Sequence, residues 1–302
     1  MNRLIPFLVM LLTLSVTTGL GAERKFEKKF AVKPGGLLRV ETDYGWITVV
    51  GTAASEVSVV ADIKGSLSDL EDFNISAAEI ENGIEVIGRG KSMRWWSWAF
   101  DDLDVRYTIE VPRDYNLDLT SSGGDINLKD IQGKVEAGTS GGDVRVGDVD
   151  GSLVLSTSGG DIVVERATGN LKAETSGGDI SIFSVTGTVD AGTSGGDVRI
   201  NNVDGKVRAE TSGGDIIVAV RGDNKGIFAE TSGGDIDIVV GKDTRATIDA
   251  STSGGAVSCN LPLTISGEID ESEVRGSVNG GGDPIYAHTS GGDIRIRTPE
   301  KE

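Results

Sequence analysis

The chain has 302 residues, of which 44 are glycine, 47 are acidic and 29 are basic, and its formal net charge is −18 at pH 7. This charge disfavours nucleic acid and anionic membrane surfaces as partners, because both repel an acidic chain. The single Cys and the single His exclude an intrachain disulfide and a zinc site built from these residue types. They also leave little room for histidine-based catalysis.

Residues 1–22 have the parts of an export signal. A short basic start precedes an apolar run over residues 4–16, and small residues end the segment at Ala22. This pattern is typical of a secretory signal peptide. We therefore predict a signal peptide over 1–22, with an uncleaved anchor as the alternative, and an exported mature chain that is periplasmic or extracellular. No second apolar stretch of spanning length follows, so we expect no transmembrane segment in the mature chain.

Residues 23–118 are expected to form an irregular β region that is continuous with the repeats after it. Leu38 and Val40 begin one of several apolar alternations in this region, which indicate half-buried strands. Residues 43–49 (Asp-Tyr-Gly-Trp-Ile-Thr-Val) look like a worn copy of the repeat corner found later in the chain. Because a stack of repeats leaves a strand edge open at its end, we expect this region to cap the first coil.

Within this region, residues 94–100 hold three of the four Trp in the chain. An exposed aromatic cluster marks a contact site for sugar, peptide or lipid. The alternative is that these rings seal the cap or pack on a neighbouring strand. The candidate binding residues are Trp95, Trp96, Trp98 and Phe100.

Residues 119–298 carry an internal repeat, and residues 299–302 form a tail. The first six copies of the repeat are 18 residues apart, and the later intervals are 20, 21 and 37 residues. The last interval spans about two repeats and predicts one degenerate copy inside it. The tetrapeptide Ser-Gly-Gly-Asp begins at Ser122, Ser140, Ser158, Ser176, Ser194, Ser212, Ser232 and Ser290, with the variant Ser-Gly-Gly-Ala at Ser253.

Each copy predicts one coil of a stacked β structure. Apolar residues alternate on both sides of the Gly-Gly pair, which indicates a strand, a sharp corner and a second strand. The predicted fold is all-β: a single-stranded β-solenoid (β-helix) of about 18-residue coils with an irregular β N-terminal cap. The Thr before each corner lies in the inward register and is expected to satisfy buried backbone groups. Cys259 also falls in the inward register and is expected to be buried.

The Asp of each corner is expected to stack in a column. Neighbouring carboxylates about 4.8 Å apart repel by roughly 1 kcal/mol in water, so something must compensate. The first interpretation is that backbone amides of the turn donate hydrogen bonds to each carboxylate. A Ca²⁺ ion between successive carboxylates is the second, and no other cofactor is expected. The column comprises Asp125, Asp143, Asp161, Asp179, Asp197, Asp215 and Asp235.

These motifs together resemble the bacterial putative-adhesin β-strand-repeat family. The resemblance rests on residues 32–40 (Val-Lys-Pro-Gly-Gly-Leu-Leu-Arg-Val), the Thr-Ser-Gly-Gly-Asp-Ile repeats, and residues 278–285 (Val-Asn-Gly-Gly-Gly-Asp-Pro-Ile). It covers about residues 30–298. It implies an exported or envelope-associated β-repeat protein, and it transfers no catalytic residue.

The sequence therefore favours a non-enzymatic exported cell-envelope β-solenoid, an adhesin-like binding or scaffold protein. Repetition builds extended surfaces, whereas an active site needs a local break from the pattern. The expected partner is an envelope protein or a glycan. The alternative is a polysaccharide-binding or polysaccharide-cleaving β-helix protein, in which two carboxylates act on a glycosidic bond. Seven equivalent Asp residues, however, single out no catalytic pair.

Overall fold

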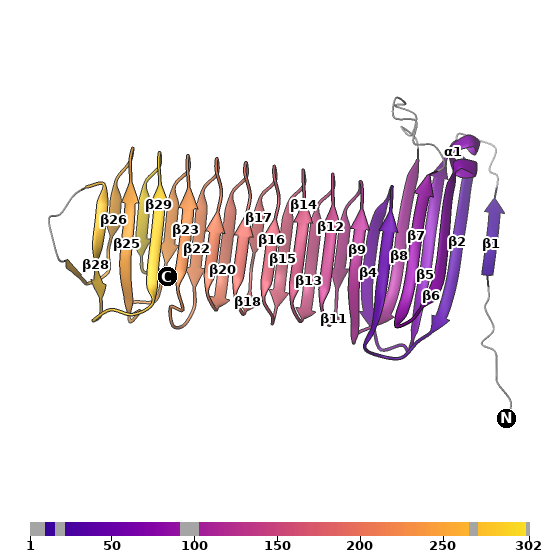
Figure 1. Ribbon diagram of the computed structural model, residues 1–302, viewed down its shortest axis with the longest axis horizontal. Helices are drawn as coiled ribbons and strands as arrows, with labels where there is room; N and C mark the ends of the chain where they lie inside the picture. Colours follow the sequence, from indigo (N-terminus) through magenta and orange to yellow (C-terminus); the bar gives the residue numbers. More distant parts are fainter. Residues whose placement is uncertain (1–9, 16–21, 91–102, 266–270, 300–302) are drawn as a thin grey trace. The chain divides into compact units, whose positions relative to one another are not determined.

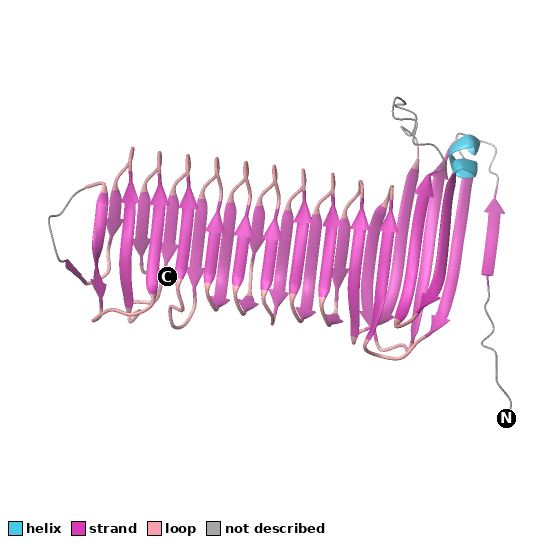
Figure 2. Cartoon of the chain, viewed as in Figure 1, coloured by secondary structure: helices cyan, strands magenta, loops and turns pink. Residues whose placement is uncertain are grey.

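The computed structural model describes residues 10–15, 22–90, 103–265 and 271–299. It divides into two compact units, unit 1 (1–150) and unit 2 (151–302). Nearly every described element is a β-strand, and α1 (Leu67–Asp72) is the one helix in the described ranges (Figures 1 and 2). None of the helical structure in these ranges has the length and apolar character needed to cross a membrane.

Unit 1 begins as antiparallel structure and continues as parallel structure. In its first sheet, β2, β5 and β8 pair antiparallel, whereas β8, β4, β10 and β13 pair parallel where their registers are given. The spatial order is β1 (Met10–Ser15), β2 (Ala22–Ala31), β5 (Glu56–Gly65), β8 (Asp104–Pro112), β4 (Trp46–Thr52), β10 (Ile126–Lys129) and β13 (Val144–Asp150), and β11 (Ile131–Gln132) pairs with β13.

The second sheet of unit 1 starts with an antiparallel hairpin and then becomes parallel. Its spatial order is β6 (Phe73–Ile80), β7 (Gly83–Gly90), β3 (Gly36–Thr42), β9 (Tyr115–Ser121) and β12 (Val135–Thr139). The core lies between the two sheets, where alternate residues such as Ile47, Val49 and Leu38 are fully buried.

Residues 43–49 form a corner like that of the repeats. Ile47 of β4 stands opposite Ile126 of β10, and Gly45 donates its N–H to Gly123 O at 3.0 Å. Gly45 and Gly124 share a left-handed backbone, with φ of 121° and 109°. The interpretation of this segment as a worn copy of the repeat is confirmed.

Unit 2 is a solenoid-like β-repeat with two sheets, in which the strands of the repeat copies pair parallel. Successive strands pair with an offset of 18 residues, as Leu153, Leu171, Val189 and Val207 do in one sheet. Alternate residues face the core, and side chains such as Ile180 are fully buried. The strands of one sheet are β14 (Leu153–Thr157), β16 (Leu171–Glu174), β19 (Val189–Gly192), β21 (Val207–Glu210) and β23 (Ile227–Thr231). Those of the other are β15 (Ile162–Ala167), β17 (Ile180–Ile182), β20 (Val198–Asp204), β22 (Ile216–Val220) and β24 (Ile236–Val239), with β18 (Val185–Thr186) beside β15 and β20.

The C-terminal strands do not stack in chain order. The last repeat copy forms β29 and β30, which lie between β23/β24 and β25/β26. The strands are β25 (Ala246–Thr252), β26 (Val257–Cys259), β27 (Leu263–Ile265), β28 (Glu273–Val278), β29 (Pro284–Thr289) and β30 (Ile294–Arg297).

Two expectations about this end are wrong. The described residues between β26 and β29 form no further parallel coil, because β27 and β28 pair antiparallel and β28 covers β25. Cys259 is half-buried rather than buried, because β26 lies at the end of its sheet and, among the described strands, has β30 on one side only.

Candidate functional site

A ladder of threonine hydroxyl groups holds the repeat corners together. Thr211 is only 7 % exposed. It donates to Gly196 O of the preceding coil at 2.9 Å and accepts the N–H of Gly214 in its own corner at 3.3 Å. Thr175 and Thr193 make the same pair of bonds. The expectation that these hydroxyls satisfy buried backbone groups is confirmed.

The second glycine of the corner is needed for this stacking. A Cβ built on Gly196 would lie 2.1 Å from Gly178 O of the coil before, and one on Gly214 would lie 2.1 Å from Gly196 O. The carbonyl oxygen of each coil therefore occupies the space that a side chain on the second glycine of the next coil would need.

The corner Asp residues form a second ladder. In unit 2, Asp179 accepts the backbone N–H of Asp197 on Oδ1 at 2.8 Å, and Asp197 accepts that of Asp215 at the same distance. In unit 1, Asp125 accepts the N–H of Asp143 at 3.0 Å. Each donor is thus the amide of the next coil's corner, which stabilises the carboxylate charge. Asp161 and Asp235 make the equivalent bonds to Asp179 and Asp293.

Arginine side chains bridge some of these carboxylates. Arg199 contacts Asp197 at 2.6 Å and Asp179 at 3.6 Å, and Arg145 bridges Asp143 and Asp125 in the same way. The guanidinium supplies positive charge between two carboxylates, the role that the sequence analysis considered for a cation. In the described ranges, no group of three or more His, Cys, Asp or Glu side chains is arranged to hold a metal ion. The Ca²⁺ interpretation stays a prediction.

Trp95, Trp96, Trp98 and Phe100 lie outside the described residues, so their binding role stays a prediction. Among the described aromatic residues, Tyr44 and Trp46 are each 38 % exposed. The Arg106 guanidinium lies 5.5 Å from the ring centroid of Trp46.

A groove of about 500 Å³ opens on unit 2, where β16, β19, β21 and β23 end at their corners. Carboxylates line it at the position before the corner Thr in three coils, and Gly192 takes that position in the fourth. Because Gly192 has no side chain, the row of carboxylates is interrupted there, and a Cβ built on Gly192 would meet no atom within 4 Å. The lining residues are Glu174, Thr175, Gly192, Thr193, Ser194, Glu210, Thr211, Ser212, Glu230 and Ser232.

A stacked pair of aromatic rings lies beside this groove. Phe228 and Tyr286, two residues before Glu230 and His288, stack with centroids 4.7 Å apart and planes 10° apart. The Arg208 guanidinium lies 4.5 Å from the Phe228 centroid and forms an ion pair with Glu210 of the groove. Lys172 pairs with Glu174 at 2.9 Å in the same way.

Sequence reasoning missed the groove because it followed the Asp that recurs at nearly every corner. The sequence does show a recurring carboxylate, because the residue before the corner Thr is Glu at 174, 210 and 230. No sequence pattern marks a groove here, because the hollow depends on Gly192 lying beside two glutamates on adjacent strands.

The model of one protein family, Toastrack DUF4097, matches residues 104–297. Among solved structures, the chain is similar to a "putative adhesin" of Bacteroides fragilis, with 13 % identity and a TM-score of 0.34. It is also similar to a "putative lipid binding protein" of Parabacteroides distasonis, with 14 % identity and a TM-score of 0.36. Each alignment covers 91 % of this chain and 97 % of the other. No curated protein matches the chain.

Proposed function

The chain belongs to the Toastrack DUF4097 family, and we propose that it is a non-enzymatic, exported cell-envelope protein of the adhesin-like or scaffold kind. In this proposal, a β-solenoid of about 18-residue coils presents the groove of unit 2 to an envelope glycan. The observation that carries the proposal is the groove itself, where hydroxyls recur at the same place in successive coils and carboxylates recur in three of the four coils.

The groove has the chemistry that recognises a sugar chain. Glu210 and Glu230 are register partners on adjacent strands, so their backbones are one strand spacing apart, about 4.8 Å. Sugar hydroxyls donate to carboxylates and both donate to and accept from serine hydroxyls such as Ser212 and Ser232. The Phe228–Tyr286 stack adds apolar ring surface beside these polar groups, a combination typical of ligand sites.

Export is supported by two basic side chains that lie on the inner face of β2. Arg24 and Lys28 lie on the same side of the strand as the buried Phe26 and Phe30. Their side chains reach carbonyl oxygens across the cap: Arg24 donates to Leu70 O at 2.8 Å and Lys28 to Ala77 O at 2.6 Å.

Charges on the inner face are a device that protects the outer edge of a sheet. β2 therefore suits the outermost strand of a mature chain from which residues 1–22 have been removed. We propose 23–118 as the cap, 119–298 as the repeats and 299–302 as a tail.

Polysaccharide cleavage is the alternative function, and the adjacent Glu210 and Glu230 favour it. Glycosidases use two carboxyl groups about 5 to 10 Å apart. The same Glu recurs at position 174, and Arg208 already pairs with Glu210. No single pair of carboxylates is therefore set apart for catalysis, and binding is the better-supported function.

A glycan array probed with mature 23–302 tests the proposal. The groove variant is Glu210→Gln with Glu230→Gln, and the matched control is Glu165→Gln, an exposed residue of β15 in the other sheet. A third protein carries Trp96→Ser and Trp98→Ser. We expect the groove variant to lose at least tenfold in affinity for the bound glycan, while the control binds like the unmodified protein.

Three results would overturn the groove assignment. Loss of binding in the Trp variant alone would place the site in residues 94–100. Equal binding by every variant would move it to another face, and no glycan bound by any protein would refute a glycan partner. New reducing ends released from a bound polysaccharide, lost in the groove variant, would favour the cleaving alternative.

A further inference from the structure

The last repeat copy fills a slot between two coils that precede it in the chain. Ile285 of β29 is the register partner of Ile227 in β23 on one side and of Ile248 in β25 on the other. Ile294 of β30 likewise stands between Ile236 of β24 and Val257 of β26. The coil over 246–259 therefore pairs with the C-terminal segment, and that segment in turn pairs with the coil that contains β23 and β24.

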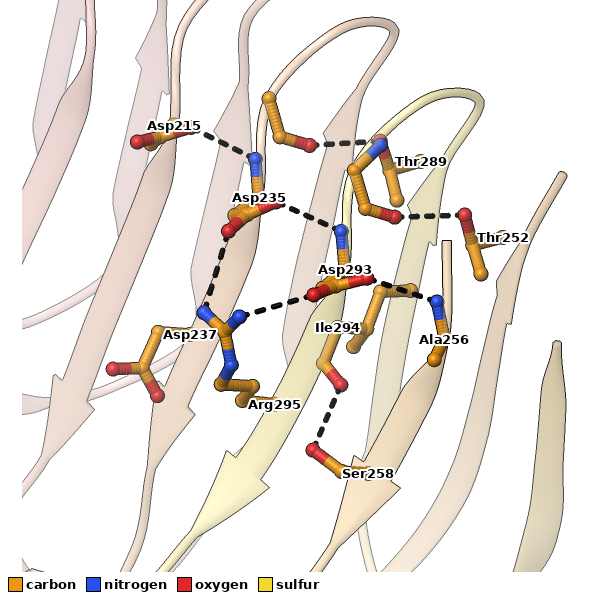
Figure 3. A network of polar contacts seen from close by, with 12 residues as sticks. Asp215, Asp235, Asp237, Thr252, Ala256, Ser258, Thr289, Asp293, Ile294 and Arg295 are labelled. Atoms are coloured by element: carbon orange, nitrogen blue, oxygen red, sulfur yellow. Dashed lines mark hydrogen bonds and ion pairs between the residues drawn. The ribbon is translucent and has the colours of Figure 1, made fainter. Parts of the chain in front are cut away.

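The contacts in this slot are those of the repeat. Asp293 donates its N–H to Asp235 Oδ1 at 2.8 Å and accepts the N–H of Ala256 at 3.0 Å (Figure 3). Thr289 donates to Gly234 O, and Thr252 donates to Gly292 O. These are the Thr and Asp ladders of the other coils, so the slot recognises the repeat motif rather than the connection that delivers it.

Outward side chains make this segment a better fit than the other copies. Arg295 bridges Asp235 and Asp293 at 3.3 and 3.1 Å (Figure 3). Arg297 makes a two-pronged ion pair with Asp237, with its shortest contact at 2.7 Å. No other repeat copy carries arginine at both of these positions. The best occupant of the slot is therefore this same segment, from its own chain or from a second copy.

The connection to the segment is a tight reversal. Asn279, Gly280 and Gly281 all have left-handed backbones, with φ of 50°, 85° and 81°. Asn and Gly are residue types that adopt this conformation at low cost, so the tight reversal depends on this short run. A connection that is extended instead carries the segment away from its own slot.

From these observations, we propose that the segment 284–297 is exchangeable, and that the slot of one molecule accepts this segment from a second copy of the chain. The exchange joins two molecules by reciprocal insertion of one coil, because each molecule donates its segment to the slot that the other has vacated. The exposed strand edges of an opened slot favour this outcome, since a parallel edge without a partner leaves backbone groups unpaired. The proposal does not depend on the ligand of the groove.

Cross-chain disulfides test the exchange in the full mature chain. One protein carries Phe228→Cys and the other Tyr286→Cys, both with Cys259→Ser, because rings 228 and 286 stack across the slot boundary. The two proteins are mixed, incubated below the melting temperature and oxidised. A disulfide between different chains forms only when β29 of one molecule lies beside β23 of the other. The control pair replaces Tyr286→Cys with Arg275→Cys, an exposed residue of β28.

We expect at least tenfold more cross-chain disulfide in the test pair than in the control pair. Equal amounts would overturn the proposal. A second variant, with Gly280 and Gly281 deleted, prevents the tight reversal, so light scattering is expected to show a folded dimer. A folded monomer of this variant would also overturn the proposal. If the deletion abolishes folding, the disulfide yield decides alone.

Discussion

Replacing Thr211 by valine tests whether the hydroxyl ladder stabilises the coils. Valine has nearly the shape of threonine, so packing is kept while two hydrogen bonds are lost. Gly196 O and the N–H of Gly214 would be left without partners at a site where the side chain is 7 % exposed. A buried polar group without a partner costs about 1 to 3 kcal/mol, so the loss for the two groups is about 2 to 6 kcal/mol.

Serine at the same position is the matched control. Thr211→Ser keeps the hydroxyl and removes one methyl group, which costs about 1 kcal/mol. The two variants are compared by urea unfolding and by the melting temperature, where about 1 kcal/mol corresponds to about 2 to 4 °C in a protein near this size. We expect valine to lower the free energy of unfolding at least twice as much as serine. If serine destabilises as much as valine, apolar packing rather than the ladder holds the corner, and the reasoning fails.

Three further predictions concern the corner and the cap. Gly214→Ala should destabilise strongly, because its Cβ would meet Gly196 O at 2.1 Å, whereas Gly213→Ala, with its nearest atom at 3.4 Å, should be tolerated; equal melting temperatures would contradict this. Asp215→Asn should keep an acceptor for the N–H of Asp235 and therefore lower the melting temperature less than Asp215→Ala. A chelator should leave the melting temperature of the unmodified protein unchanged; a fall on chelation would favour bound Ca²⁺. Burial raises the pKa of Tyr107, so its contribution to stability should be full below about pH 10 and lost as pH rises further. Tyr107→Phe should then give a flatter alkaline unfolding curve, and an unchanged curve would exclude Tyr107 as the cause.

The repeating coil could be predicted from the amino-acid pattern alone. Apolar residues alternate with period two around a Gly-Gly corner, and this pattern repeats every 18 residues. The pattern predicts stacked parallel strands, because strands in that register place every Thr and every Asp above its equivalent. The inward Thr ladder and the worn copy over residues 43–49 were predictable for the same reason. Those contacts are local to the repeat, and each copy carries the residues that make them.

The order of the coils and the place of the groove could not be predicted in this way, because both depend on how the strands pair in the folded chain. A Thr-Ser-Gly-Gly-Asp segment makes the same ladder contacts in any slot, so nothing in the motif says that residues 284–297 precede 246–259 in space. One residue hinted at it: Ala256 stands where other coils have Asp, and its coil is the last of its sheet, where no following amide needs an acceptor. The groove depends on Gly192 lying between Glu174 and Glu210 on neighbouring strands. Such a juxtaposition exists only once the strands are paired.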